Sequence, residues 1–455
     1  MLKNYLKSIS VLAFILTFYS CSEDDNYVPI VIQANTDAAE VSQNSTVTID
    51  VLSNDTNVPN DGILTTENGS NGTTQVIDSN ATPSNPSDDV ILYTPNFDFV
   101  GSDTFQYTIC DDNNNCATGT VTVTVSPVSP VSLDLDNMPY ATLSEYNFFD
   151  GELKDLDPVF GVLPYDLNSP LFSDYAHKKR FVWMPEGTKA NYNSDFTPLD
   201  FPVGSVLIKN FYYDNVQPSN STRIIETRLM YMTEDGWDFA KYVWNDEQTE
   251  ASFTNAGSFT NVEWIENGNT NNVTYRIPSR SECFTCHNKF DTPVPIGPKP
   301  QNLNRDLSYP EGTNNQLQKW IEVGYLENNL PTSIVSTVNW EDESLDLELR
   351  VRSYLDINCA HCHSEESYCE YRPMRFAFNE NDDDTNKGVC VPPDTQISGT
   401  SHIIVPNNID ASVLRFRINS IEEQNRMPLL GRTMTHFEGV RLIDDWINTL
   451  NGECE

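Results

Sequence analysis

The chain has 455 residues, of which 38% are hydrophobic, so it is long enough for several cores, and about three domains are expected. Its 27 Lys and Arg residues against 66 Asp and Glu residues give a formal net charge of -39 at pH 7. A surface this acidic repels phosphate backbones, which argues against nucleic acid as a partner. The acidity serves either to keep the chain soluble or, in addition, to attract a basic partner protein.

The first 20 residues predict a bacterial lipoprotein signal peptide. Lys3 and Lys7 give a positive start, and the apolar run from Val11 to Phe18 is too short to span a bilayer. The run leads to Cys21, and this arrangement resembles the box at which lipoproteins are cleaved and acylated. We therefore expect Cys21 to be the lipidated first residue of the mature chain, with an ordinary cleaved signal peptide as the alternative.

An acidic tether is expected at residues 21–30. Its Ser22–Asp25 stretch resembles a signal that sends some lipoproteins to the cell surface. No second segment is long or apolar enough to cross a membrane. The expected location is therefore the outer membrane, reached through a lipid anchor, facing either the cell surface or the periplasm.

Residues 31–126 predict an N-terminal all-β sandwich of the Ig-like kind, because short alternating runs are broken by turn residues. In the clearest hairpin, two sets of apolar residues alternate on either side of a loop at 111–115: Phe105, Tyr107 and Ile109, then Val121, Val123 and Val125. Cys110 and Cys116 flank that loop and are expected to form a disulfide.

Three runs in this region resemble bacterial Ig-like, cadherin-like modules: residues 50–55, 93–96 and 101–105. The resemblance implies a spacer or an adhesive unit. Calcium at Asp50, Asp55 or Asp61 is an alternative, but acidic loop residues are more often simply solvated, and we favour solvation.

A stiff Pro-containing linker is expected at residues 127–139, followed by a β-rich domain at residues 140–280. Four runs predict strands there: residues 206–208, 211–213, 224–229 and 242–244. The chain contains no glycine-rich nucleotide loop, no serine-hydrolase elbow and no zinc-protease helix.

Two Cys-x-x-Cys-His pentapeptides carry the chemistry of the chain: Cys283, Cys286 and His287, then Cys359, Cys362 and His363. Two thiols one helical turn apart can form thioethers to the two vinyl groups of a haem, and the following histidine then lies beneath the iron. The motifs predict two covalently bound haem c groups, with the four cysteines as attachment sites and the two histidines as iron ligands.

Two other interpretations of the paired cysteines are weaker. A zinc site would need both pairs in adjacent knuckles, but they lie far apart in the sequence. A thioredoxin-type redox pair would need a strand–helix setting, which the sequence does not predict.

Residues 346–455 predict an all-α cytochrome c-like region around the second motif. An amphipathic helix precedes the motif, with Leu347, Val351, Tyr354 and Leu355 on one face. A second amphipathic helix, expected to end at Gly452, contains Val440, Ile443, Ile447 and Leu450, with Trp446 beside them. In c-type cytochromes the first and last helices cross and shield the haem, which this arrangement resembles.

Met427 is the expected sixth ligand of the second iron, because it lies on a Pro-marked loop after His363, as in that family. Met434 is the alternative. His361 is expected to lie near the haem edge without binding iron.

The first haem segment, residues 281–345, is less complete. Its Ile296–Pro298 run resembles the loop whose Pro carbonyl accepts the proximal histidine N–H. No Met or His lies between His287 and His361, so the sixth ligand comes from elsewhere or is absent. The candidates are His177, Met184, Met230, Met232, His402 and His436.

Three cysteines remain. We expect a Cys369–Cys390 disulfide with Cys454 free, and Cys390–Cys454 is the alternative pairing.

Several short runs between residues 140 and 455, in order with both haem motifs, resemble a largely uncharacterised family of exported dihaem c-type cytochromes: residues 164–168, 171–176, 225–229, 242–245, 295–299 and 354–356. The resemblance implies haem c at both motifs and electron transfer, without an established substrate.

The sequence therefore predicts single-electron transfer outside the cytoplasm, between redox partner proteins that it does not identify. The first alternative is a dihaem redox enzyme, peroxidase-like, with a five-coordinate first haem. An adhesin with incidental haem ranks last.

Overall fold

The computed structural model describes residues 31–455, so the predicted signal peptide, Cys21 and the acidic tether of residues 21–30 lie outside the described residues. The described residues divide into two compact units, with the boundary between Val128 and Ser129. This boundary falls inside the segment predicted as a linker.

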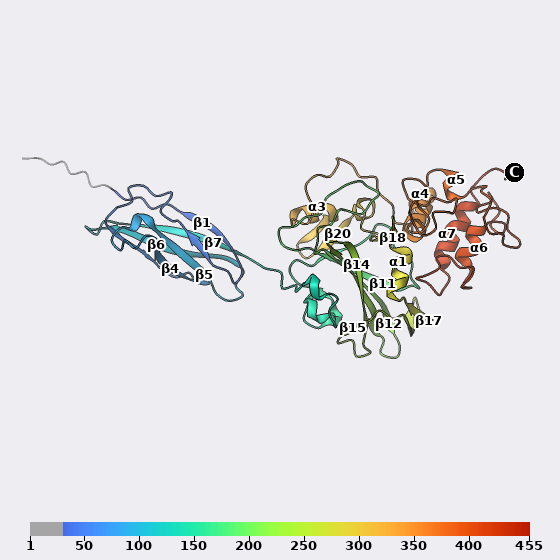
Figure 1. The fold of residues 1–455 in the computed structure, drawn as a ribbon, viewed down its shortest axis with the longest axis horizontal. Helices are drawn as coiled ribbons and strands as arrows, with labels where there is room; N and C mark the ends of the chain where they lie inside the picture. Colours follow the sequence, from blue (N-terminus) through green and yellow to red (C-terminus); the bar gives the residue numbers. More distant parts are fainter. Residues whose placement is uncertain (1–30) are drawn as a thin grey trace, which may run out of the picture. The chain divides into compact units, whose positions relative to one another are not determined.

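The first unit is a sandwich of two β-sheets (Figure 1). One sheet has the strand order β1 (Asp37–Ser42), β7 (Cys116–Ser126), β6 (Gly101–Asp111) and β3 (Gly62–Thr66). The other has the order β2 (Val47–Ile49), β5 (Asp89–Pro95) and β4 (Gly72–Asp78). β1 pairs in parallel with β7, and the predicted all-β Ig-like sandwich is confirmed for this unit.

The β6–β7 hairpin has the predicted alternation, because its apolar side chains fill the core between the sheets. Phe105, Tyr107 and Ile109 are buried on β6, and alternate valines are buried on β7. Cys110 and Cys116 are register partners at the end of the hairpin and are joined by a disulfide.

The second unit is built on an antiparallel sheet of eight strands. Its main path runs β10 (Leu163–Tyr165), β11 (His177–Trp183), β12 (Val206–Val216), β13 (Ser221–Thr233), β14 (Gly236–Trp244) and β15 (Ala251–Phe253). β16 (Ser258–Glu266) pairs with β12 and with β17 (Asn269–Ile277). The runs at 206–208 and 211–213, predicted as two strands, belong to the single strand β12.

Side chains alternate between the two faces of this sheet, and each face has its own core. Phe181, Ile208 and Tyr242 lie in the core on one face, which residues 131–159 help to cover. Val182 and Leu207 lie in the core on the other face, with Trp320 of α3 (Gln316–Glu322). The candidate site lies on this second face.

The rest of the second unit consists of short elements and long loops. The helices are α1 (Arg280–Cys286), α2 (Pro300–Leu303), α3, α4 (Leu347–Leu355), α5 (Asp384–Lys387), α6 (Val413–Asn419) and α7 (Phe437–Ile447). The small hairpins are β8 (Phe149–Asp150) with β9 (Asp157–Pro158), β18 (Asn288–Lys289) with β19 (Thr292–Pro293), and β20 (Asp306–Tyr309) with β21 (Gly312–Asn315). Three 3-10 turns of this unit cover residues 135–137, 144–146 and 153–155, and another, at residues 86–88, belongs to the first unit.

The predicted all-α cytochrome c-like region is therefore wrong. Within the described residues, 33% are in strands and 16% are helical, and the seven α-helices are all short. The two amphipathic helices do form, as α4 and α7, and they share one core. The residues between them form mostly turns and loops, because they are rich in Asp, Asn and Pro, which favour turns over helix. α7 ends at Ile447 rather than at Gly452.

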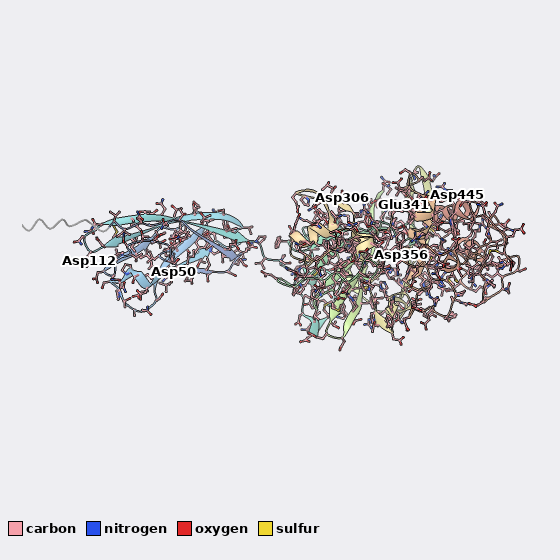
Figure 2. The ribbon with its side chains drawn as sticks, turned by 90° about the horizontal axis from the view of Figure 1, so that it is seen from above. Asp50, Asp112, Asp306, Glu341, Asp356 and Asp445 are labelled. Atoms are coloured by element: carbon pink, nitrogen blue, oxygen red, sulfur yellow. A yellow bond between two sulfur atoms is a disulfide. The ribbon has the colours of Figure 1, made fainter. Side chains whose placement is uncertain are left out.

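The predicted Cys369–Cys390 disulfide is also wrong. Cys390 is bonded to Cys454, and Cys369 is buried with a free thiol. Carboxylates are distributed over both units, for example Asp50 and Asp112 in the first and Asp306 and Asp445 in the second (Figure 2). Within residues 31–455 no helix has both the length and the apolar character needed to cross a bilayer.

Candidate functional site

The first motif lies on α1, whose start is fixed by a carboxylate. Glu282 accepts hydrogen bonds from the backbone N–H and the hydroxyl of Ser279, at 2.8 and 3.1 Å, and forms an ion pair with Arg276. This capping arrangement satisfies donors at the start of the helix. Phe284 packs edge-on against Phe239 of the sheet, with ring centroids 5.1 Å apart.

His287 follows α1 directly and is oriented by a backbone carbonyl. Its Nδ1 lies 2.9 Å from the carbonyl oxygen of Val294, so Nδ1–H donates and the lone pair is on Nε2. Burial lowers the pKa of His287 to about 3, so the imidazole is neutral, as an iron ligand must be.

The accepting carbonyl differs from the expected one. It belongs to Val294 and not to a residue of the Ile296–Pro298 run. The β18–β19 hairpin returns the chain to the histidine, where the Val294 N–H also donates to the His287 carbonyl oxygen at 3.2 Å. The sequence did not reveal this short hairpin.

A cavity of about 150 Å³ adjoins the first motif. Cys283, Cys286 and His287 line it from one side. The sheet face lines it with two kinds of side chain: apolar Leu207, Met230 and Phe239, and basic Lys209, Arg228 and Lys241. Of the six proposed sources of a sixth ligand, only Met230 lines this cavity; His177, Met184, Met232, His402 and His436 do not.

The second motif follows α4 through a π-helical turn, Asp356–Ala360, which contains Cys359. π-Helical turns often occur at functional sites. This one is fixed by the buried Asp356 carboxylate, which accepts from the Phe378 N–H and from the Gln301 side chain, both at 3.0 Å.

His363 is buried at 7% exposure, and no described residue forms a hydrogen bond with its ring. Burial lowers its pKa to about 4, so this imidazole is also neutral at pH 7. The buried Nδ1 of His363 thus lacks the carbonyl partner that the Nδ1 of His287 has.

A larger cavity, of about 380 Å³, adjoins the second motif. It is lined by Cys359, Cys362 and His363, and also by Met427, as expected for a sixth ligand. Met434 packs in a different core. No residue of α4 or α7 lines this cavity, and α6 contributes Leu414 and Ile418 instead. The expectation that the first and last helices shield the second site is therefore wrong.

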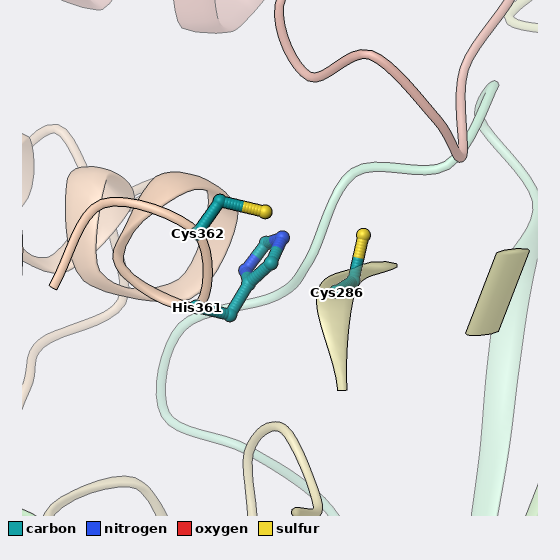
Figure 3. Close-up of side chains that lie close together, drawn as sticks. All are labelled: Cys286, His361 and Cys362. Carbon is teal, nitrogen blue, oxygen red and sulfur yellow. The ribbon is translucent and has the colours of Figure 1, made fainter. Parts of the chain in front are cut away.

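The two cavities adjoin, because both are lined by Cys286, His361, Pro428 and Leu430. Figure 3 shows Cys286 facing His361 and Cys362, which come from the other motif. The sulfur atoms of Cys286 and Cys362 and a ring nitrogen of His361 all lie within 4.8 Å of one another. The thiol–thiol hydrogen bond lowers the pKa of Cys286 and raises that of Cys362.

These three residues are the only His, Cys, Asp or Glu group within residues 31–455 whose ligand atoms lie that close. Asp50, Asp55 and Asp61 form no such group. Instead, Asp55 accepts hydrogen bonds from the Tyr107 hydroxyl at 2.9 Å and from the Asn35 N–H at 2.7 Å.

The sequence did not indicate several of the residues that line the two cavities. Met374 lines the second cavity with Met427, and it lies soon after His363 without a recognisable signal. Lys209 could have been found, because it alternates with Leu207 and Phe211 and so belongs to the inward face of β12.

Comparison with known proteins identifies the first unit. Residues 26–124 match the family model for a bacterial Ig domain, so the chain contains an Ig-like domain. No curated protein matches the chain.

Matches among solved structures are distant. A 2,6-sialyltransferase from Photobacterium sp. JT-ISH-224 is 14% identical, over 23% of this chain and 21% of that chain, with a TM-score of 0.16. Protocadherin gamma B7, as extracellular cadherin domains 1-4, is 9% identical over 54% and 76%, with a TM-score of 0.18. SGBP-B of Bacteroides ovatus is 11% identical over 64% and 67%, with a TM-score of 0.14. This chain spans about a fifth of the sialyltransferase chain.

Proposed function

We propose that this chain is an exported dihaem c-type cytochrome that transfers single electrons outside the cytoplasm. The observation that carries the proposal is that each Cys-x-x-Cys-His motif opens onto a cavity, and the two cavities share a wall. The resemblance of residues 140–455 to exported dihaem cytochromes supports the same conclusion.

The residues at both motifs suit covalently held haem. Cys283 and Cys286 offer two thiols beside one cavity, and Cys359 and Cys362 offer two beside the other. A bound haem supplies one-electron chemistry at its iron. His287 and His363 are neutral ligands, and Val294 orients the first of them. Met427 is the sixth ligand that we assign to the second iron.

The wall that the two cavities share favours electron transfer between the two motifs over two sites that act independently. Cys286 and Cys362 meet there, so groups attached to the two motifs would adjoin. The acidic surface suits a basic redox partner protein, because opposite charge speeds association. Lipidation at Cys21 would hold the chain at the outer membrane, with the Ig-like domain as a spacer.

A dihaem redox enzyme is the second candidate. The observation that favours it is the first cavity, where basic side chains lie beside Met230, the only methionine that lines it among the described residues. If Met230 is not a ligand, the first iron has an open position for a substrate.

Optical and paramagnetic-resonance spectra of the mature protein test the proposal. Two low-spin centres support electron relay, with both sixth positions filled. A high-spin centre that responds to added peroxide supports the enzyme. The Met230→Leu variant separates the two further, because it creates a high-spin centre only if Met230 binds iron.

A further inference from the structure

Four basic residues lie in direct opposition across the sheet that lines the first cavity. The strand register pairs Arg180 with Lys209, Lys209 with Arg228, and Arg228 with Lys241. They therefore form one row across β11, β12, β13 and β14, all on the cavity face. Like charges directly opposite one another destabilise a sheet. This row is unexpected in a chain whose net charge is -39.

Two members of the row have a carboxylate partner. Arg180 lies 2.6 Å from Asp166, and Arg228 forms an ion pair with buried Glu226. Lys241 donates instead to two backbone carbonyls, those of Ala256 at 2.5 Å and Pro278 at 2.8 Å. Within residues 31–455, Lys241 thus has hydrogen bonds but no ion pair.

Among the described residues, the Lys209 ammonium group has no hydrogen-bond partner and no ion pair. Its Nζ lies 5.0 Å from the centre of the Phe211 ring. Burial is the largest cause that lowers the pKa of Lys209 well below its ordinary value; the charges of Arg180, Lys178 and Arg228 also lower it, and the charge of Glu226 acts in the opposite direction. An ammonium group held beside other cations in a desolvated cavity is costly unless an anion completes the site.

The next row of side chains on the same face is apolar, and it indicates which kind of ligand the cavity suits. Leu207, Met230 and Phe239 lie one pleat away from Lys209, Arg228 and Lys241, and all six line the cavity. The cavity therefore presents an apolar floor beside a cationic edge. Such a surface suits a ligand with a carboxylate or similar anionic group.

We propose that Lys209, together with Arg228 and Lys241, binds anionic oxygen atoms inside the first cavity. Two sources share this chemistry: the propionate carboxylates of a haem attached at Cys283 and Cys286, or a small free oxyanion. The first source rests on the proposed function, whereas the second does not require it.

The test uses Lys209→Gln, with Lys179→Gln as the matched control. Lys179 lies on β11, but it is exposed and has the opposite phase to Arg180, so it faces away from the cavity. Thermal unfolding is compared for haem-loaded protein and for haem-free protein, each with and without nitrite or inorganic phosphate. Mass spectrometry records whether haem is attached, so failure of the proposed function is detected separately.

We expect the change in unfolding temperature caused by Lys209→Gln to have opposite signs in ligand-free and in ligand-bound protein. In haem-free, anion-free protein, Lys209→Gln raises the unfolding temperature, because it removes repulsion from the row. If the propionates are the ligand, the variant lowers the unfolding temperature and the first reduction potential of loaded protein. If a free oxyanion is the ligand, nitrite or phosphate stabilises wild type and binds the variant at least about tenfold more weakly, a loss of about 1.4 kcal/mol. The proposal is overturned if Lys209→Gln has the same effect on unfolding in every state, or if it matches Lys179→Gln throughout.

Discussion

The sulfur atoms of Cys286 and Cys362 lie within 4.8 Å of each other, although each belongs to a different Cys-x-x-Cys-His motif. Each motif thus places one cysteine at the wall between the cavities and one away from it. Covalent attachment of haem would occupy both sulfurs and keep them apart chemically. The state of this pair therefore reports directly on whether the motifs are loaded.

We predict that haem-free protein, exposed to a mild oxidant, forms a Cys286–Cys362 disulfide. The reason is proximity, because disulfide formation requires the two sulfurs to approach closely. Peptide mapping without reduction would detect the cross-link between the two motifs. The Cys362→Ser variant should abolish it, and haem-loaded protein should not form it. Disulfides within each motif, Cys283–Cys286 and Cys359–Cys362, would contradict the arrangement of the wall.

The second prediction concerns the two methionines of the second cavity. Met427→Ala is expected to lower the reduction potential of one centre, because methionine ligation raises it. Met374 lines the same cavity, so Met374→Ala serves as the control, and we expect it to shift the reduction potential much less. A redox titration of each variant measures the difference. If Met374→Ala produced the larger shift, the ligand assignment would have to be exchanged.

The third prediction is a pH dependence in the Ig-like domain. Burial, and after it the charges of Asp55 and Asp50, raise the pKa of Asp37 from 3.8 to about 6. Native protein therefore holds this proton more tightly than unfolded protein does, and the stabilisation present below about pH 4 is lost as pH rises through 6. Asp37→Asn should unfold near the wild-type temperature at pH 4 and above it at pH 7.

Thermal unfolding at both pH values measures this effect. Asp61→Asn, which removes an exposed loop carboxylate, is the control and should shift the unfolding temperature equally at both values. A gain for Asp37→Asn that does not depend on pH would contradict the account of Asp37.

The fourth prediction concerns the Cys390–Cys454 disulfide, which closes a loop with a sequence separation of 64. Cys454→Ser should lower the free energy of unfolding by about 4 kcal/mol in the chain-entropy description. Denaturant unfolding measures the loss. Reducing agent, which breaks Cys110–Cys116 in both proteins, should remove the difference in stability between wild type and Cys454→Ser. Equal stability of wild type and variant would show that the bond does not restrict the unfolded chain.

Local patterns predicted those elements in which one face is buried and the other solvated. Phe105, Tyr107 and Ile109 alternate on β6, and Val351 and Tyr354 lie on one face of α4, because each periodicity follows from the geometry of a single element. The two Cys-x-x-Cys-His motifs were also found from the sequence alone, because they are defined by local spacing. Their placement beside two adjoining cavities depends on tertiary packing and could not be read in this way.

The errors arose where distant residues decide the outcome. Two amphipathic helices suggested an all-α region, but nothing in α4 or α7 fixes the long loops between them. The Cys390–Cys454 bond joins residues whose proximity depends on those loops. The row of basic residues likewise requires the register of four strands, which no single strand reveals.

Mass spectrometry of protein matured in a host that exports and attaches haem tests the central claim most directly. The account predicts two haem adducts per chain, one on the peptide containing Cys283 and Cys286 and one on the peptide containing Cys359 and Cys362. Four unmodified cysteines at these positions would contradict it.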